Sequence, residues 1–205
     1  MCNKLPCRRL ISDQDLLEYQ QKTEQNVGIL LPIDYLKRGQ VYGHQDSTGQ
    51  MVGGFILITH FPFRAIDSIP QAVTNIDFNK MIEINGLWFR PKDKTKSATS
   101  LFWIQLLSLL ILTMFGNQKF HLCYAYTLKK IKLQKIYGIM KPKIIYRGPV
   151  KPLPGNTGGQ DESIEMVSLI QLLSFPYKLL YLWKAAFLEK KTKWAHYLTI
   201  SKGRS

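Results

Sequence analysis

The sequence has few cysteines and few acidic residues, and both shortages exclude classes of protein. Cys2, Cys7 and Cys123 are an odd number without metal-ligand spacing, so a disulfide framework is not expected and a reducing cytosol fits better. Asp and Glu number 14 against 28 Lys and Arg, which gives a formal net charge of +14. This excess predicts attraction to an anion: nucleic acid, acidic lipid or a phosphorylated cofactor. A merely solubilising surface is the alternative.

Signals for export, metal binding and several enzyme classes are also missing. The start, MCNKLPCRRLISDQDLLEYQ, has no apolar signal core, so we expect a cytoplasmic protein. The histidines form no H-x-x-x-H pair and none lies at ligand spacing from a cysteine, so no metal is expected. Neither a Walker loop nor a G-x-S-x-G elbow occurs.

The apolar run Leu101–Phe115 is short for a membrane span. It has fifteen residues, whereas a span needs about twenty. A buried helix packed on a sheet explains it more simply, and a span is the alternative. The tail SFPYKLLYLWKAAFLEKKTKWAHYL mixes aromatic residues with lysines, which suits an interfacial helix on anionic lipid. Peripheral membrane contact through this C-terminal helix, a core helix and a homodimer helix all stay open.

Strand and helix patterns alternate along a chain whose length suits one domain. The 205 residues, 45% of them hydrophobic, can bury a sizeable core. Ser12 and Asp13 can cap a first helix, and the turn residues Asp46–Gly49 separate two β-rich arms, as in a hairpin. The other expected elements are strands in KMIEINGLWFRP, KFHLCYAY and KPKIIYRGPV, and helices at Thr99–Phe115 and in TLKKIKLQKIYG.

This order predicts an α/β (α+β) fold, in which helices flank a mixed central β-sheet. The adjacent early strands imply an antiparallel half, and the later strand–helix alternation implies α/β character. We expect the main domain to cover residues 1–150. A loop rich in Pro and Gly follows at 151–163, and Ile164–Thr192 is helix-like, so residues 164–205 are expected to form a C-terminal helical extension.

A basic stretch lies directly before the apolar helix. Lys92, Lys94 and Lys96 precede the small residues Ser97–Ser100. A helix N-terminus offers unpaired backbone N–H groups and about half an elementary positive charge, and small residues let a phosphate approach the backbone. The stretch therefore has parts suited to a diphosphate. A basic surface loop before a core helix is the plainer alternative.

The same stretch resembles the acyl-CoA loop of the GCN5-related N-acetyltransferase superfamily, usually Val-x-Pro-x-x-Arg-x-x-Gly-x-Gly/Ala. Phe89-Arg90-Pro91 matches Val-x-Pro, Lys94 occupies the Arg position, and Ser97 and Thr99 replace the two glycines. The resemblance implies acyl-CoA or acetyl-CoA as co-substrate. The degenerate loop leaves poor CoA binding, another acyl carrier or no donor as alternatives. The implied donor-binding residues are Trp88, Phe89, Lys94, Lys96, Ser97, Thr99 and Ser100.

The surrounding sequence carries the same resemblance from about Arg8 to Val150. QVYGHQDSTGQMVGGFIL is similar to the superfamily's second-to-third strand hairpin. LQKIYG is similar to its fourth helix, where a tyrosine often serves as general acid, and Tyr137 stands at that place. VGGFILITHFPFRAIDSIP with IEINGLWFRP resembles the acyl-homoserine-lactone synthase branch, although Ile56–Ile58 occupies the region of that branch's arginine.

Acyl transfer from a thioester to an amine needs a base, a donor to the carbonyl oxygen and an acid for the thiolate. Glu83 is the candidate base, because a carboxylate beside apolar neighbours can have a raised pKa; a solvent-facing strand residue is the alternative. The resemblance makes Tyr137 the candidate acid, and a core tyrosine is the alternative. Backbone N–H groups near Trp88 and Phe89 are the candidate carbonyl donors if the strand splays there, as it does in the superfamily.

The sequence thus predicts an N-acyltransferase that moves an acyl group from acyl-CoA or an acyl carrier protein to a small-molecule amine. The alternative is a catalytically inactive protein of the same fold that acts as a basic membrane-surface or nucleic-acid-binding module. Basic and aromatic residues interleave at Lys129–Arg147, but no known nucleic-acid recognition motif occurs, so nucleic acid is not the favoured partner. We expect a cytoplasmic location, with peripheral membrane contact as the variant.

Overall fold

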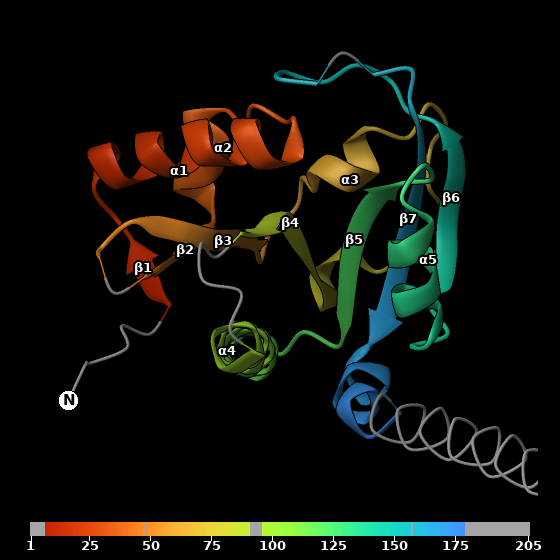
Figure 1. Ribbon diagram of the computed structural model, residues 1–205. Helices are drawn as coiled ribbons and strands as arrows, with labels where there is room; N and C mark the ends of the chain where they lie inside the picture. The colour runs from red at the N-terminus through yellow and green to blue at the C-terminus, as the bar shows by residue number, and fades with distance from the viewer. Residues whose placement is uncertain (1–6, 47, 91–95, 157, 179–205) are drawn as a thin grey trace, which may run out of the picture.

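A mixed seven-stranded sheet forms the centre of the molecule (Figure 1). The computed structural model describes residues 7–46, 48–90, 96–156 and 158–178. The strand order is β1-β2-β3-β4-β5-β7-β6, in which β4 and β5 are parallel and all other neighbours are antiparallel. The strands are β1 Arg8–Leu10, β2 Gln40–Gln45, β3 Met51–Ile58, β4 Met81–Phe89, β5 His121–Thr127, β6 Lys143–Pro149 and β7 Asp161–Ser168.

Helices cover both faces of this sheet, as predicted. One apolar cluster joins the sheet to α1, α2 and α3, and a second joins the opposite face to α4, α5 and the helix that follows β7. Figure 1 shows α1–α3 above the sheet and α4 below it. The helices are α1 Asp13–Val27, α2 Ile33–Arg38, α3 Arg64–Asp67, α4 Lys96–Gly116 and α5 Ile131–Gly138, with a 3-10 turn at Phe78–Lys80 and a further helical segment at 169–178.

Local signals in the sequence set the boundaries of the N-terminal elements. The Ser12 hydroxyl accepts a hydrogen bond from the Asp15 backbone N–H (3.1 Å), so the predicted cap of α1 is confirmed. α1 ends at Gly28, whose φ of 82° is the left-handed conformation favoured at helix ends. The predicted hairpin is confirmed as β2 and β3, and its turn is held by the Asp46 carboxylate, which accepts from the Thr48 N–H.

α4 is longer and more exposed than the sequence analysis expected. Its range includes the predicted helix Thr99–Phe115, but only one side of it packs against the sheet. On its outer side Ile104, Leu112 and Phe115 are 62%, 67% and 59% exposed. Among the described helices, the window Thr99–Gly116 is the one long and apolar enough to cross a bilayer by length and composition, and 28% of it is buried. The expected packing of this helix on the sheet is therefore confirmed, but the helix is buried on one side only.

The C-terminal boundary predicted from sequence is also wrong. Residues 161–168 form β7, an interior strand between β5 and β6, so the loop ends before 161 and the helical segment begins only at 169. The strand is buried on both faces, which removes the alternating pattern that marks a half-exposed strand. Its two glutamates, Glu162 and Glu165, disguise it further, because each is buried and hydrogen-bonded.

Candidate active site

β4 and β5 pair only at their first residues and then separate. The paired positions are Met81 with His121, Ile82 with Leu122, and Glu83 with Cys123. Beyond them β5 continues along β7 alone, from Tyr124 to Thr127, and β4 continues along β3 alone. The two parallel strands therefore form a wedge in the middle of the sheet.

A bulge in β4 lies where the strands separate. Trp88 stands opposite Gly54 and Asn85 opposite Ile56, so Gly86 and Leu87 together face one residue of β3. An extra residue bends the bulged strand, and this bend is in the part of β4 that has left β5. Gly86 has a φ of +56°, and its carbonyl oxygen accepts a hydrogen bond from the Tyr19 hydroxyl (2.8 Å).

A cavity of about 190 Å³ occupies the wedge. Its walls come from the bulged part of β4, the end of β5, and α5. Three further segments complete the cavity wall: the connection that joins α1 to α2, the helix α3, and the segment that leads from the β6–β7 connection into β7. Because these segments belong to both faces of the sheet, the cavity is reached by side chains from both sides.

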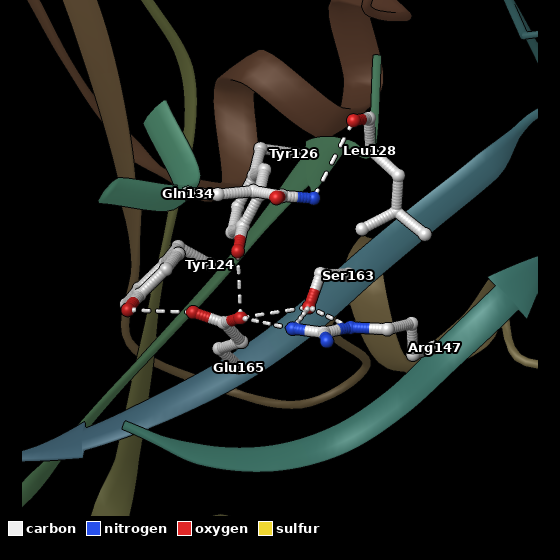
Figure 2. Close-up of polar contacts among 7 residues, drawn as sticks. All are labelled: Tyr124, Tyr126, Leu128, Gln134, Arg147, Ser163 and Glu165. Carbon is white, nitrogen blue, oxygen red and sulfur yellow. Dashed lines mark hydrogen bonds and ion pairs between the residues drawn. The ribbon is translucent and has the colours of Figure 1, made fainter. Parts of the chain in front are cut away.

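A buried carboxylate fixes two tyrosines on the β5 wall of the cavity (Figure 2). Glu165, which is 2% exposed, accepts hydrogen bonds from the hydroxyls of Tyr124 (3.1 Å) and Tyr126 (2.7 Å). Ser163 donates a third bond at 2.7 Å, and Arg147 forms an ion pair with the carboxylate at 3.4 Å. Burial raises the pKa of both phenols, so they stay protonated as donors. This network holds the rings in fixed orientations.

Tyr137 of α5 lies against these two rings and lines the cavity. Its ring centroid is 4.8 Å from that of Tyr124 and 5.1 Å from that of Tyr126. Burial raises the pKa of Tyr137 to about 12, with smaller contributions from Tyr126 and Glu165. The phenol is therefore protonated at neutral pH, as a general acid must be before it acts. Its catalytic role stays a prediction.

Glu83 lies neither on the cavity wall, as expected for the base, nor on the solvent-facing side of its strand. It is fully buried, which excludes the solvent-facing alternative, and it is not among the residues that line the cavity. Its carboxylate accepts from the Tyr35 hydroxyl (2.9 Å) and from the backbone N–H groups of Arg64 (2.9 Å) and Ala65 (2.6 Å). Burial raises its pKa, and these donors oppose the rise. These bonds tie the start of α3 to the sheet, which gives Glu83 a structural role.

Trp88 and Phe89 point to opposite faces of β4. The Trp88 indole N–H donates to the Thr23 hydroxyl on α1 (3.1 Å), and the Phe89 ring stacks on Phe102 of α4 with centroids 4.3 Å apart. The Arg90 N–H donates to a β3 carbonyl oxygen at 2.7 Å. Because N–H directions alternate along an antiparallel ladder, the Trp88 N–H also faces β3 and the Phe89 N–H faces away from it. Phe89 is thus the better candidate carbonyl donor of the two.

The basic stretch before α4 is described only in part. Lys94 lies outside the described residues, and Lys96 and Ser97 begin α4 without a description of their side chains. Thr99 is half-buried and Ser100 exposed in the first turns of the helix. The sequence-predicted diphosphate contacts of these residues stay predictions. No cluster of three or more metal-ligating side chains occurs within the described part of the chain.

Two charged residues of the cavity were missed by the sequence analysis. Glu162 of β7 is 8% exposed, accepts from the Gln160 side-chain amide (3.0 Å), and has a pKa raised by burial. Arg64 at the start of α3 donates to the Pro154 carbonyl oxygen (2.7 Å). Glu162 stood in a segment interpreted as a loop, and Arg64 in a connection without a motif, so no local signal marked either.

Comparison with known proteins identifies the fold. No family profile and no curated protein matches the sequence. Among solved structures, FeeM, an N-acyl amino acid synthase from uncultured soil microbes, superposes with a TM-score of 0.56 at 11% identity, over 82% of this chain and 92% of FeeM. Mutant forms of the spermidine/spermine N-acetyltransferase SpeG from Vibrio cholerae superpose with a TM-score of 0.55 at 12% identity, over 83% of this chain and 97% of SpeG. This chain has the fold of the GCN5-related N-acetyltransferases.

Proposed function

We propose that the protein transfers an acyl group from a thioester donor, acyl-CoA or an acyl carrier protein, to an amine. The observation that carries the proposal is the wedge between β4 and β5, which has a bulged strand on one wall and Tyr137 on the other. Both similar proteins named above are N-acyl- or N-acetyltransferases by name. The fold alone does not determine an activity, so the proposal depends on this site.

The residues of the wedge fit the steps of acyl transfer. The Phe89 N–H, which faces away from β3 just beyond the part of β4 that lines the cavity, is the donor to the carbonyl oxygen, on which negative charge develops. Tyr137 protonates the departing thiolate, and Glu162, which lines the cavity where Glu83 does not, takes a proton from the attacking amine. A CoA donor would place its diphosphate at the start of α4, near Lys94, Lys96 and Ser97–Ser100.

Donor binding gives the first test. At a concentration about 100-fold above its Kd, a ligand stabilises the folded state by about 2.7 kcal/mol, so acetyl-CoA or a long-chain acyl-CoA should raise Tm by roughly 5–10 °C. Lys94→Glu should abolish the shift, because it places a negative charge where the diphosphate binds. Lys22→Glu on α1, on the opposite face of the sheet, is the matched charge reversal and should keep the shift. If no acyl-CoA or acyl carrier protein moves the wild-type melt, the proposed function is wrong.

We also propose that the outer face of α4 contacts an anionic membrane surface. From Ser97 to Gly116 the helix carries no charged residue, and its exposed apolar side chains lie on the same face of the sheet as the segment 169–178, whose Ile170 is also exposed. Lys80 and Lys141 lie at this end of the molecule, where their backbone carbonyl oxygens accept hydrogen bonds from Phe120 and Gln171. An apolar face beside lysines suits lipid with acidic headgroups.

Vesicle sedimentation tests this contact. The full chain should bind phosphatidylglycerol vesicles more tightly than phosphatidylcholine vesicles, and added salt should weaken the binding. Leu112→Glu should lower the partition constant about tenfold or more, since one buried apolar side chain contributes roughly 1.5–3 kcal/mol. Ile11→Glu changes an exposed isoleucine elsewhere and should have little effect. A Leu112→Glu protein that binds vesicles normally, or that differs only in its oligomeric state, would rule out the lipid contact.

A further inference from the structure

Two oppositely charged side chains line the cavity without forming a pair. Arg64 and Glu162 both contribute to its wall. Within the described part of the chain, neither takes part in an ion pair. Burial raises the pKa of Glu162 and lowers that of Arg64; the charges of Glu83 and Glu162 oppose the shift at Arg64, and the charge of Arg64 opposes the shift at Glu162. The two groups are therefore within electrostatic reach of one another but too far apart for direct contact.

Both charges approach the wedge from the same face of the sheet. Arg64 begins α3, on the α1–α3 face. Glu162 has the same orientation on β7 as Ile164, which packs in the cluster of that face, whereas Ser163 and Glu165 contact the tyrosines of the other. Tyr137 stands on the α4–α5 face. The charge pair and the candidate acid are thus on opposite sides of the reacting position, as acceptor and donor groups should be.

Glu162 is buried and Arg64 is half-buried, and the partners described above, the Gln160 amide and the Pro154 carbonyl oxygen, are neutral. Removing a charge from water without an opposite charge beside it is costly, so a ligand that carries both signs would stabilise both groups. We propose that the acceptor is a free amino acid, whose carboxylate binds Arg64 and whose ammonium group binds Glu162. The inference rests on the proposed acyl-transfer function and specifies its acceptor. Arg64 suits the carboxylate because a guanidinium presents parallel N–H donors to two oxygens.

The remaining wall limits the side chain of this amino acid. Val27 and Ile29 supply apolar surface on the same side of the cavity, and Leu153 also lines it. The cavity of about 190 Å³ must also receive the thioester end of the donor, so a compact apolar side chain fits. Lys130 and Arg64 outnumber the single lining carboxylate, Glu162. A polyamine, which needs several negative partners, is therefore a poor match.

The proposed reaction balances in atoms and protons. The ammonium group gives one proton to the Glu162 carboxylate, and the free amine nitrogen attacks the thioester carbon. The new C–N bond forms, the C–S bond breaks, and the thiolate takes the proton of Tyr137. The second proton lost from nitrogen restores the Tyr137 phenol, and Glu162 releases its proton to water. The products are an N-acyl amino acid, a thiol and one proton.

Matched acceptors test the carboxylate contact. Thiol release is measured with leucine against 3-methylbutylamine and with phenylalanine against phenethylamine, with short- and long-chain acyl-CoA as donors. Each pair shares its side chain and differs by the carboxylate. In the wild type, kcat/KM should be about 10–100-fold higher for the amino acid, since a charge-assisted contact contributes about 1.5–3 kcal/mol. Arg64→Gln should remove this preference, so that each amino acid and its matched amine react with kcat/KM values within about twofold of one another.

The donor-induced thermal shift separates failure of the inference from failure of the proposed function. If acyl-CoA still raises Tm but amino acids react no faster than their matched amines, the acceptor is not recognised by its carboxylate and the inference is wrong. An Arg64→Gln protein that loses rate equally on both members of a pair would contradict the inference as well. The shift in Arg64→Gln also shows that the variant is folded, because Arg64 additionally binds the Pro154 carbonyl oxygen.

Discussion

Tyr137→Phe is expected to lower kcat for acyl transfer by about 100-fold or more, while the protein stays folded. The substitution removes only the phenol oxygen, so the ring contacts with Tyr124 and Tyr126 remain. The thiolate then has to leave without a proton from the enzyme. Because the interaction is made only in the transition state, kcat and kcat/KM should fall together.

The expected pH dependence of the wild-type protein follows from the same residue. Burial raises the pKa of Tyr137 to about 12, from an ordinary value of 10.0. A raised pKa in the folded state means that the phenol stabilises the fold fully below pH 10 and loses this contribution as the pH rises towards 12. Any alkaline loss of rate below about pH 10 must therefore come from another group. Rate profiles and urea titrations between pH 7 and 11 measure both effects.

Tyr124→Phe is the matched control for the effect of Tyr137→Phe on kcat. Tyr124 also lines the cavity, but its hydroxyl is bound to Glu165. Removing it should cost about 1 kcal/mol of stability, because the carboxylate loses one donor, with a far smaller effect on kcat. If both variants lose rate to the same extent, or if Tyr137→Phe loses none, Tyr137 is not the acid.

Gly86→Ala is expected to reduce the free energy of unfolding by about 2–5 kcal/mol. A Cβ at this position would lie 2.6 Å from the Tyr19 hydroxyl oxygen and 2.9 Å from a methyl carbon of Leu31, and the φ of +56° strains any residue with a side chain. Tyr19 and Leu31 are both fully buried and packed, so neither can move without cost. The bulge, and with it the bend in β4, should therefore be lost or distorted.

Gly49→Ala separates the cost of backbone strain from the cost of the steric clash in Gly86→Ala. Gly49 has a φ of +81° in the β2–β3 turn, but a Cβ there meets no atom within 4 Å. Gly49→Ala should therefore reduce the free energy of unfolding by only about 1 kcal/mol, from backbone strain alone. Urea denaturation of both variants gives the comparison, and the donor-induced shift shows whether the wedge survives in folded Gly86→Ala. Equal losses at the two positions would mean that the packing around Gly86 does not hold the bulge.

The parts of the fold that were predicted correctly depend on short-range chemistry. The Ser12 cap and the Asp46 turn form within a few residues, so the sequence carries their full signal. The wedge does not have such a signal, because it requires strands that separate and walls from segments far apart in the chain. The resemblance to a known fold predicted that the strands separate and that Tyr137 lies near this point. It did not predict that Glu162 and Arg64 line the cavity.

Buried carboxylates explain why the burial of Glu83 and the strand β7 were not predicted from the sequence. A glutamate in a sequence normally indicates an exposed position, since an unpaired buried charge is costly. Glu83 and Glu165 are buried because their hydrogen-bond partners, such as Tyr35 and Tyr126, come from other elements. Tyr35 and Tyr126 lie 48 and 39 residues away in the sequence from the carboxylates that they bind. The full burial of Glu83 was therefore not predicted, and its role as base stays a prediction. The same effect, together with burial on both faces, hid the interior strand β7.

The interior position of β7 also determines when the protein can fold during its synthesis. β6 pairs with no other described strand, and the wider end of β5 pairs with β7 alone. Until residue 168 has been made, β6 has nothing to pair with and β5 presents open backbone groups to other nascent chains. The last of the described strands to leave the ribosome therefore completes the sheet, and a truncated chain that ends at residue 150 should be insoluble rather than a smaller version of the domain.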